Sequence, residues 1–391
     1  MSLITNIYPQ NHAFTRNPIL VSVSAPTLAT YKVYANNILV FTGNGTGNFT
    51  VNISEILETV FGDTNTPVGN GMLLMMEQYN NYTYATFEVT TDGEDTETVS
   101  ITAWKGGINN ADYRYLRNQG TSIFSVKLMN YSGNFFFTTR SYGWTICMKE
   151  TELEPLALVM PTIPGEVHMD SFIKIRETVT GRLIQVNGYA GVLMALNMEA
   201  VRKEFFVRYG VLANLFDIID PYHSSRVACR IAIEEAENAP ERCAVRFLNS
   251  FGVYERIDLI GKMMISTIQN DYEDGTFKKY DEVTDSFVKS RTRTAIGQVY
   301  KVKTGEKRTE ELNFIMDMLA SDSVYLVLPD SEIKVIPSIE NMARAYRQTE
   351  PENMEITFKP VEEESNFTAV ATNYGSTRPR IFTSKFSEQF N

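Results

Sequence analysis

Short runs of alternating hydrophobic and polar residues follow one another along most of this chain, and the clearest lies near its middle. From Val253 to Ile260 the two kinds of residue alternate at nearly every position. Such alternation places successive side chains on opposite faces of a sheet, as a half-buried strand requires. A mostly apolar run, Ala244–Leu248, precedes it across an Asn-Ser-Phe-Gly corner. Asn249 can bond its own backbone in a turn and Gly252 can adopt a positive φ, so the pattern predicts a hairpin in a β-rich domain.

The N-terminal part, residues 1–105, repeats this pattern in shorter runs separated by Gly, Asn, Pro and Asp. Seven short strands with regular turn signals favour an immunoglobulin-like or fibronectin-like β-sandwich. A helical turn is expected at Ser54–Glu58. The candidate strands are Ile19–Ser24, Tyr31–Tyr34, Ile38–Thr42, Phe49–Ile53, Gly71–Glu77, Thr83–Val89 and Thr98–Ala103, and the predicted turns include Ala25-Pro26, Asn36-Asn37 and Gly43–Gly45.

Residues 106–155 are expected to form a connecting arm with extra strands. Asp112–Arg117 fits either a helix or an extended arm, and Ile123–Met129 and Asn134–Thr139 are candidate strands. Two arginines beside two tyrosines in the first of these segments raise an RNA contact as one interpretation. The acidic surroundings favour a surface turn with stacked tyrosines instead.

Prolines at 155, 161 and 164 mark the start of a larger β-rich domain, residues 156–360. One amphipathic helix is predicted at about 307–320, because Leu312, Ile315, Met316 and Leu319 recur at helical spacing. Residues 361–391 lack periodicity and are expected to form a C-terminal arm. The predicted strands are Phe172–Arg176, Leu183–Val186, Val192–Met198, Glu204–Val211, Ala213–Ile219, Ala228–Ala232, Cys243–Leu248, Val324–Pro329, Ile333–Pro337 and Met354–Phe358.

The composition narrows the classes of partner. The net charge is −11, and through residue 104 nine acidic residues face only Arg16 and Lys32, so a phosphate-binding surface for nucleic acid is not expected. The N-terminal residues do not resemble a signal peptide, and no run approaches the ~20 apolar residues of a membrane-spanning helix. We therefore expect a protein assembled in a cytoplasm, with no membrane span.

Candidate chemistry is sparse. The three cysteines, Cys147, Cys229 and Cys243, have no metal-site spacing and predict buried thiols in a reducing compartment. Cys147 and His168 meeting in space is a weaker alternative. His12, His168 and His223 are far apart in the sequence.

The one cluster with acid–base potential is Asp217 and Asp220 near His223, although it reads more simply as a strand running into a proline turn. Paired carboxylates for glycoside hydrolysis stay open, because such pairs are often distant in sequence. Asp271–Gly275 departs from a calcium loop and fits an acidic turn. No catalytic, cofactor-binding or metal residue is predicted, so the chain is expected not to be an enzyme and to need no cofactor.

Several stretches, taken in order, resemble tail-associated structural proteins (tail tip or baseplate type) of phages and prophages of Bacteroides-type gut bacteria. Each stretch is short, and the shared order carries the resemblance; residues 105–155 and 360–391 take no part in it. The stretches are Thr15–Ile19, Asn52–Leu57, the Cys243–Gly252 corner, Tyr300–Gly305, the helix to Leu319, Ala320–Leu326 and Val335–Pro337.

The resemblance implies a non-enzymatic structural component of a virion tail that assembles with copies of itself and with other tail proteins. Two alternatives stay open. Aromatic-rich sandwiches also occur in carbohydrate-binding or glycan-processing proteins, so contact with a host-surface glycan is one alternative. A component of a phage-derived contractile injection system is the other.

Overall fold

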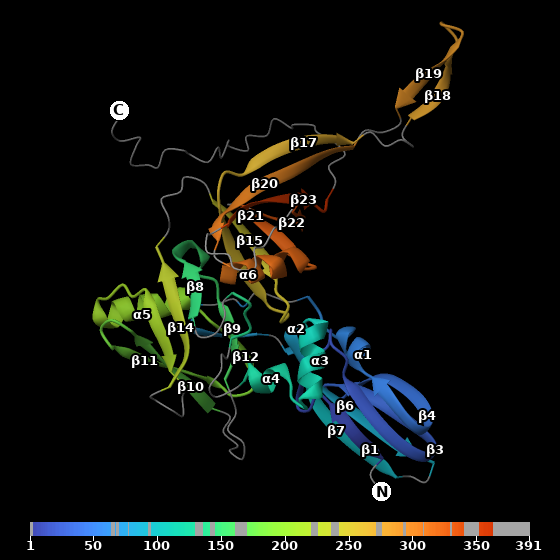
Figure 1. The fold of residues 1–391 in the computed structure, drawn as a ribbon, viewed down its shortest axis with the longest axis vertical. Coiled ribbons are helices and arrows are strands. Elements are labelled where there is room, and N and C mark those ends of the chain that lie inside the picture. The colour runs from blue at the N-terminus through green and yellow to red at the C-terminus, as the bar shows by residue number, and fades with distance from the viewer. Residues whose placement is uncertain are drawn as a thin grey trace. The chain divides into compact units, whose positions relative to one another are not determined.

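The computed structural model describes residues 3–63, 67, 70–76, 78–92, 95–129, 136–140, 145–160, 170–219, 226–235, 242–270, 276–291, 295–307, 309–328, 331–339 and 352–362. Within these residues it contains 23 strands and six α-helices, so the chain is mainly β, as predicted (Figure 1). It forms two compact units, the first of Met1–Ile265 with Tyr300–Lys359 and the second of Ser266–Val299 with Pro360–Asn391. The predicted boundaries at 105, 155 and 360 stay predictions.

The N-terminal region forms one six-stranded sheet in the order β1-β3-β6-β7-β2, with β4 paired to β3. The predicted turn at Asn36-Asn37 is confirmed by positive φ values of 48° and 68°. The predicted turns at Ala25-Pro26 and Gly43–Gly45 are wrong, because β3 and β4 run through them and a register shift between Ala25 and Ala29 accommodates the proline. The immunoglobulin-like arrangement stays a prediction. The elements are β1 (Ile4–Tyr8), β2 (His12–Phe14), β3 (Leu20–Ala35), β4 (Ile38–Asn52), α1 (Ser54–Glu58), β6 (Tyr82–Thr91) and β7 (Thr96–Trp104).

Three short helices, α2 (Gln78–Asn81), α3 (Asn110–Asn118) and α4 (Ile123–Val126), connect this sheet to the next ones. The predicted strand at Ile123–Met129 is wrong, because α4 occupies its first half; a strand would bury Val126 on the same face as Phe124 and Leu128, but Val126 is 51% exposed. Of the predicted strand Asn134–Thr139, the first two residues lie outside the described residues, and the rest contributes a single bridge, Phe136 to Leu158.

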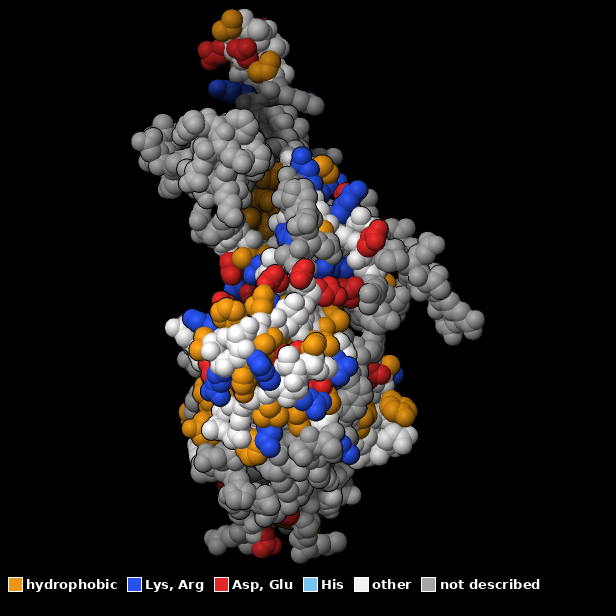
Figure 2. Space-filling model, turned by 90° about the vertical axis from the view of Figure 1, so that its left-hand side faces the viewer, with side chains coloured by type: hydrophobic (Ala, Val, Ile, Leu, Met, Phe, Trp, Pro, Cys, Tyr) orange, Lys and Arg blue, Asp and Glu red, His pale blue; other side chains and the backbone are white. Residues whose placement is uncertain are grey.

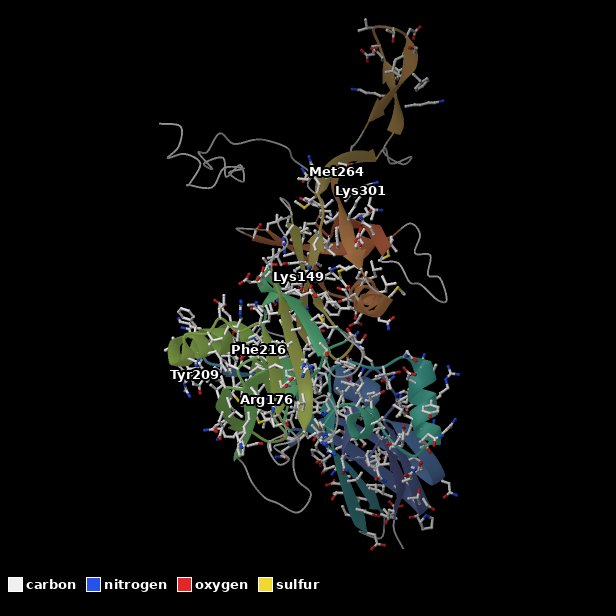
Figure 3. All side chains as sticks on the ribbon, turned by 60° about the vertical axis from the view of Figure 1, so that its left-hand side comes forward. Lys149, Arg176, Tyr209, Phe216, Met264 and Lys301 are labelled. Carbon is white, nitrogen blue, oxygen red and sulfur yellow. The ribbon has the colours of Figure 1, made fainter. Side chains whose placement is uncertain are left out.

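The middle of the chain forms a five-stranded sheet, β11-β10-β13-β14-β8, and a three-stranded sheet, β5-β12-β9. Helix α5 (Met198–Tyr209) shows that two predictions are wrong: the strand at Glu204–Val211, and a single helix, at about 307–320, in the domain of residues 156–360. Phe205 of α5 packs on Phe216 of the sheet with ring centroids 5.4 Å apart. Figure 3 labels Phe216 on β13 and Tyr209, the last residue of α5. The strands are β5 (Leu73–Met75), β8 (Thr145–Lys149), β9 (Leu156–Val159), β10 (Asp170–Glu177), β11 (Leu183–Tyr189), β12 (Leu193–Leu196), β13 (Leu215–Ile219) and β14 (Val227–Glu234), with a 3-10 helix at Glu150–Glu152.

Local residues explain why α5 forms. The Asn197 side chain accepts a hydrogen bond from the Ala200 backbone N–H at 3.2 Å, which is an N-cap. Gly210 ends the helix with φ 67°. Between the two caps, Val201 and Phe205 are fully buried one turn apart.

The last sheet has seven strands in the order β16-β15-β21-β22-β23-β20-β17, and β15 and β16 form the predicted central hairpin. The predicted C-terminal helix is confirmed as α6 (Thr309–Ala320), which buries Leu312, Ile315 and Met318 against this sheet. The strands are β15 (Arg242–Leu248), β16 (Tyr254–Ile260), β17 (Met264–Asn270), β20 (Ala295–Lys307), β21 (Val324–Leu328), β22 (Ser331–Ser338) and β23 (Glu352–Pro360). In the second unit, β18 (Thr276–Asp281) and β19 (Ser286–Arg291) form a separate two-stranded hairpin.

An aromatic cluster joins the parts of the first unit. Phe14 stacks on Phe251 of the central corner at 5.6 Å, and Trp104 stacks on Tyr82 at 4.8 Å and lies 5.3 Å from Phe137. The cluster therefore takes rings from the N-terminal sheet, the connecting segment and the central hairpin. Such aromatic contacts add to the stability gained by burying the rings.

The backbone of the corner lies directly against the end of the N-terminal sheet. The Gly107 N–H donates to the Ser250 carbonyl at 2.7 Å, and the Asn81 amide donates to the Gly252 carbonyl at 3.0 Å. Gly252 has φ 77°, and a side chain there would collide with the Lys105 carbonyl oxygen. Glycine at 252 is thus required both by the turn and by this close approach.

We predict that Gly252→Ala lowers the free energy of unfolding by about 3 kcal/mol, since it adds a backbone collision to an unfavourable φ. The matched control is Gly181→Ala, which has a similar φ of 70° and open space around the added methyl group. The control should cost only about 1–2 kcal/mol. Urea unfolding followed by tryptophan fluorescence measures both, and equal losses would contradict the close-approach argument.

Candidate functional site

The histidine and carboxylate candidates do not assemble into a reactive group among the described residues. His168, His223 and Asp220 lie outside them. His12 lies in the aromatic cluster, where the Trp104 indole N–H donates to its Nδ1 at 3.3 Å. Burial lowers the pKa of His12 to about 4, so the ring is neutral at physiological pH. A neutral ring bonded to an indole has a packing role.

Asp217 is held between two arginines on the neighbouring strands. In the sheet register it lies opposite Arg176 on β10 and Arg230 on β14, and its carboxylate is 2.8 Å and 2.7 Å from their guanidinium groups. Burial by itself would raise the pKa of Asp217, but the bonds and charges of both arginines lower it. This carboxylate therefore stays ionised and serves the sheet as a cross-strand ion pair.

The three cysteines lie on separate strands and form no disulfide. Cys229 and Cys243 are buried, and burial raises the pKa of both thiols, of Cys243 to about 12. Cys147 on β8 is exposed, which corrects the prediction of three buried thiols. It lies on the alternate, outward face of β8, between the buried Ile146 and Met148.

A second cluster of titratable groups is fully buried near the central hairpin. The Arg140 guanidinium lies 2.6 Å from a carboxylate oxygen of Glu152 and 3.3 Å from one of Glu255, and over the ring of Phe314 at 4.8 Å. Thr138 donates a hydrogen bond to Glu255 at 2.5 Å. These groups tie the connecting segment to β16 and α6.

The charge balance of this cluster explains its pKa shifts. Burial raises the pKa of Glu152 and of Glu255, and the Arg140 charge opposes that change without cancelling it. A carboxyl whose pKa is raised on folding stabilises the fold most at low pH, and this contribution is lost as the pH rises through the raised value. Because the side chains are 3–7% exposed, no substrate reaches them, and the cluster has a structural role.

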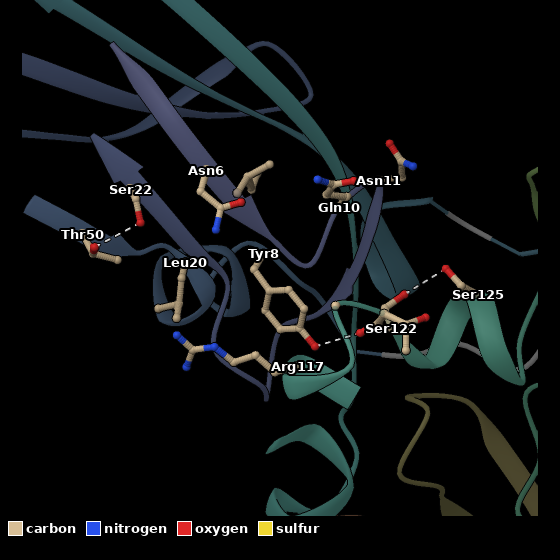
Figure 4. A pocket seen from close by; sticks show the side chains of 13 residues that line it. Asn6, Tyr8, Gln10, Asn11, Leu20, Ser22, Thr50, Arg117, Ser122 and Ser125 are labelled. Carbon is tan, nitrogen blue, oxygen red and sulfur yellow. Dashed lines mark hydrogen bonds between the residues drawn. The ribbon is translucent and has the colours of Figure 1, made fainter. Parts of the chain in front are cut away.

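A polar pocket on the N-terminal sheet is open to ligand. It has a volume of about 410 Å³ and lies between β1, β3, the end of α3 and the start of α4 (Figure 4). Most of its lining is neutral and polar, with a single cation and no carboxylate. The lining residues that carry polar or charged side chains are Asn6, Tyr8, Gln10, Asn11, Ser22, Thr50, Arg117, Thr121, Ser122 and Ser125.

Local sequence places the cation of this pocket. The Asn109 side chain accepts from the Asp112 N–H at 2.8 Å and caps α3, which then buries Tyr113 and Leu116 on one face. Gly120, at φ 66°, ends the helix, and the Thr121 N–H returns to the Leu116 carbonyl at 3.0 Å. Arg117 in the last turn is thereby directed over the Tyr8 ring, 5.9 Å from its centroid.

Tyr8 is fixed in the pocket by two contacts. Its hydroxyl donates to the Thr121 carbonyl at 2.9 Å, and its ring meets Tyr113 edge-on at 5.8 Å. A second hollow of about 380 Å³ continues from the pocket along β3 and β4 and shares Ser22 and Thr50 with it. The two hollows form a groove of hydroxyl and amide groups.

Sequence reasoning missed this groove. Its residues come from segments near positions 6, 22, 50 and 120, which the sheet brings together, and none forms a motif. The one signal in the sequence was the pair of arginines beside tyrosines in the segment that forms α3. One interpretation of that pair was an RNA contact. The structure places one of those arginines in the pocket and the other, Arg114, on the exposed side of the helix.

No known protein family and no curated protein matches the sequence. Comparison with solved structures gives a periplasmic chaperone, SfaE (6% identity, TM-score 0.16, 60% of this chain and 98% of that one), and an ice-binding adhesin of an Antarctic bacterium (8%, 0.14, 92% and 97%). A 1.5-MDa bacterial ice-binding adhesin (8%, 0.14, 79% and 94%) is similar to the same degree. Likenesses this weak carry no argument about fold or function.

Among the described residues, no group of three or more His, Cys, Asp or Glu side chains could hold a metal ion. No helix in the described part of the chain has the length and apolar character needed to cross a bilayer.

We predict that Arg140→Met lowers the free energy of unfolding by about 3–5 kcal/mol near neutral pH, because it leaves two buried carboxyls without a cation. The loss should be smaller at pH 5 than at pH 8, since protonation removes the uncompensated charge. Thermal melts at both pH values measure the difference. The control, Lys32→Met, breaks the Lys32–Glu88 pair on the surface of the N-terminal sheet and should change the stability little at either pH. A pH-independent loss for Arg140→Met would contradict the assignment.

Proposed function

We propose that this chain is a non-enzymatic structural component of a bacteriophage tail, of the tail-tip, baseplate or tail-associated ring type, that assembles through contacts between subunits. The ordered resemblance to such proteins supports the identity, and the free edge of β4 supports assembly. In this proposal the chain is made in the bacterial cytoplasm and resides in the virion tail. Its N-terminal sheet would serve as an immunoglobulin-like or fibronectin-like module.

Strand β4 is the observation that carries the assembly proposal. It is 15 residues long, has no buried residue, and among the described strands pairs only with β3. Its sequence, ILVFTGNGTGNFTVN, contains no charge and no proline. Soluble proteins usually protect exposed edges with lysines, prolines or short strands, because unpaired backbone groups recruit another chain. An unprotected edge of this length is suited to pairing with a strand of a neighbouring subunit.

Aromatic rings cover two glycines of β4. The Tyr31 ring lies over Gly43 and the Phe49 ring over Gly45, each so closely that the ring would have to move to admit a larger residue at the glycine. Aromatic cover of this kind compensates for the packing that glycine lacks in a strand. The strand therefore stays ordered while its outer edge remains available.

The hairpin of the second unit offers another contact surface. It pairs with no further strand among the described residues, and a two-stranded hairpin alone is marginally stable in water. Its hydrophobic side chains are exposed, with Val283 at 93% and Phe287 at 69%. Burying these side chains against another copy would stabilise the hairpin. Two different surfaces of one chain favour a head-to-tail contact, which closes into a ring when the rotation permits.

We predict that the wild-type chain forms oligomers and that Leu39→Lys with Thr42→Lys shifts it to monomer, because lysines on an edge strand oppose pairing. The control pair, Thr98→Lys with Tyr115→Lys, adds the same charge to exposed positions on β7 and α3. Size-exclusion chromatography with light scattering measures the mass of each. A monomeric wild type, or equal masses for the two variants, would exclude β4 as the assembly surface.

We also expect the chain to be present in purified particles released from the host that carries its gene. Mass spectrometry of those particles, with antibody labelling viewed by electron microscopy, gives its presence and position. Labelling at the tail supports the proposal. Its absence from intact particles would exclude a virion role.

A further inference from the structure

Other surfaces of the described residues were weaker candidates for a site. Phe206 and Val207 of α5 are exposed, as is Leu212 just after the helix, but Figure 2 shows hydrophobic and basic side chains interspersed on this side of the molecule. That surface has no hollow among the described pockets, and nothing indicates what would cover it. The polar groove on the N-terminal sheet combines a hollow, a charge and oriented polar groups.

We propose that the pocket around Arg117 and Tyr8 binds an acidic sugar, that is, a pyranose ring carrying a carboxylate such as a uronic or sialic acid. This goes beyond a role in assembly, because it gives the subunit a ligand on a surface. The groove that continues past Ser22 and Thr50 would take the next sugar of a chain.

The charge of the pocket selects an anion. Arg117 is the only cation in the lining of the two hollows, and neither Asp nor Glu lines them. A guanidinium can hold a carboxylate through two parallel hydrogen bonds, which is stronger than a bond between neutral groups.

The remaining lining matches sugar hydroxyls. The side chains of Asn6, Gln10 and Asn11 each offer both N–H donors and a carbonyl acceptor, and they are exposed at the opening. Ser22 and Thr50 share a hydrogen bond at 3.2 Å on the groove side (Figure 4). A sugar hydroxyl both donates and accepts, so neutral amides and hydroxyls suit it better than a row of charges does.

The size and rigidity of the pocket agree with this ligand. A volume of about 410 Å³ falls within the range of small-molecule sites and admits a sugar ring. Tyr8 is held by its bond to Thr121 and by Tyr113, and Asn11 has a fixed left-handed backbone with φ 64°. Groups that are ordered before binding lose little entropy when the ligand arrives.

Other ligand classes fit less well. Nucleic acid requires several cations along a path, and this groove has one. Protein metal sites are usually built around carboxylate, imidazole or thiolate ligands, and the lining contains none of these. An apolar ligand requires hydrophobic walls, whereas most of this lining is polar. Inorganic phosphate shares the negative charge of an acidic sugar, so the experiment must separate the two.

The test is binding of methyl glucuronide and N-acetylneuraminic acid to the purified full chain, measured by saturation-transfer NMR and titration calorimetry. Methyl glucoside, acetate and inorganic phosphate serve as the comparison ligands. We expect the acidic sugars to bind at least about tenfold more tightly than the neutral sugar or acetate, with affinity that falls as salt is added. Phosphate or acetate binding as tightly as the acidic sugars would overturn the proposal, as would no binding of either acidic sugar.

Three variants locate the site. Arg117→Gln should lower the affinity for acidic sugars at least about tenfold, and Asn6→Asp should do the same by placing a negative charge in the pocket. The control Arg114→Gln lies on the same helix, where its guanidinium donates to the Asn110 carbonyl at 3.1 Å outside the pocket, and should bind as the wild type does. All three positions are exposed, so the variants should fold, which circular dichroism checks. Unchanged binding by Arg117→Gln would overturn the proposal whatever the assembly state of the chain.

Discussion

The buried side-chain amide of Asn249 is the contact on which the rest of the first unit depends. Its N–H groups donate to the Phe137 carbonyl at 2.8 Å and to Glu255 at 2.7 Å, and its oxygen accepts from the backbone of Phe251 and Val253. One side chain thus shapes the central turn and attaches it to the connecting segment and to β16. Each of these buried groups would cost about 1–3 kcal/mol if left without a partner.

The same corner also contacts helix α6 and the end of the N-terminal sheet. The Ser250 N–H and hydroxyl donate to Asp317 of α6, and the Thr139 hydroxyl donates to the same carboxylate at 2.7 Å. On its other side the corner meets the end of the N-terminal sheet at Gly107 and closes the aromatic cluster. Sheets that are distant in sequence are therefore fixed by a few polar bonds surrounded by rings, which is a rigid arrangement well suited to a building block.

Buried charges in this acidic chain are compensated in two different ways. Asp217 has two arginines and a lowered pKa, whereas Glu152 and Glu255 share Arg140 and have raised pKa values. Burial opposes the charged form at all three carboxyls; at Asp217 the hydrogen bonds and charges of two arginines outweigh burial, whereas at Glu152 and Glu255 the opposing effects, with Arg140 as their one cation, do not. Two features of the surface of the N-terminal sheet differ from these: the lining of the polar pocket has one arginine and no carboxylate, and β4 pairs with no described strand other than β3. We therefore propose ligand binding at the pocket and assembly at strand β4, both of which belong to the N-terminal sheet.

The sequence alone determined the β-rich class, the central hairpin with its Asn-Gly corner, and helix α6. Each depends on residues within a few positions of one another, namely period-two alternation, turn formers and apolar residues at helical spacing. Helix α5 also has local signals, because Met198, Val201 and Phe205 have helical spacing between Asn197 and Gly210. The β-branched and aromatic residues in the same segment nevertheless favoured the prediction of a strand.

The tertiary structure decided what depends on pairing between distant segments. It joined predicted strands into β3 and β4, assigned β5 to a sheet with β12, and exposed Cys147. It placed Asp217 between Arg176 and Arg230, and it brought Asn6, Thr50 and Arg117 to one pocket. Register between strands that are far apart in the chain follows from the packing of whole sheets, and no local pattern of residues encodes it.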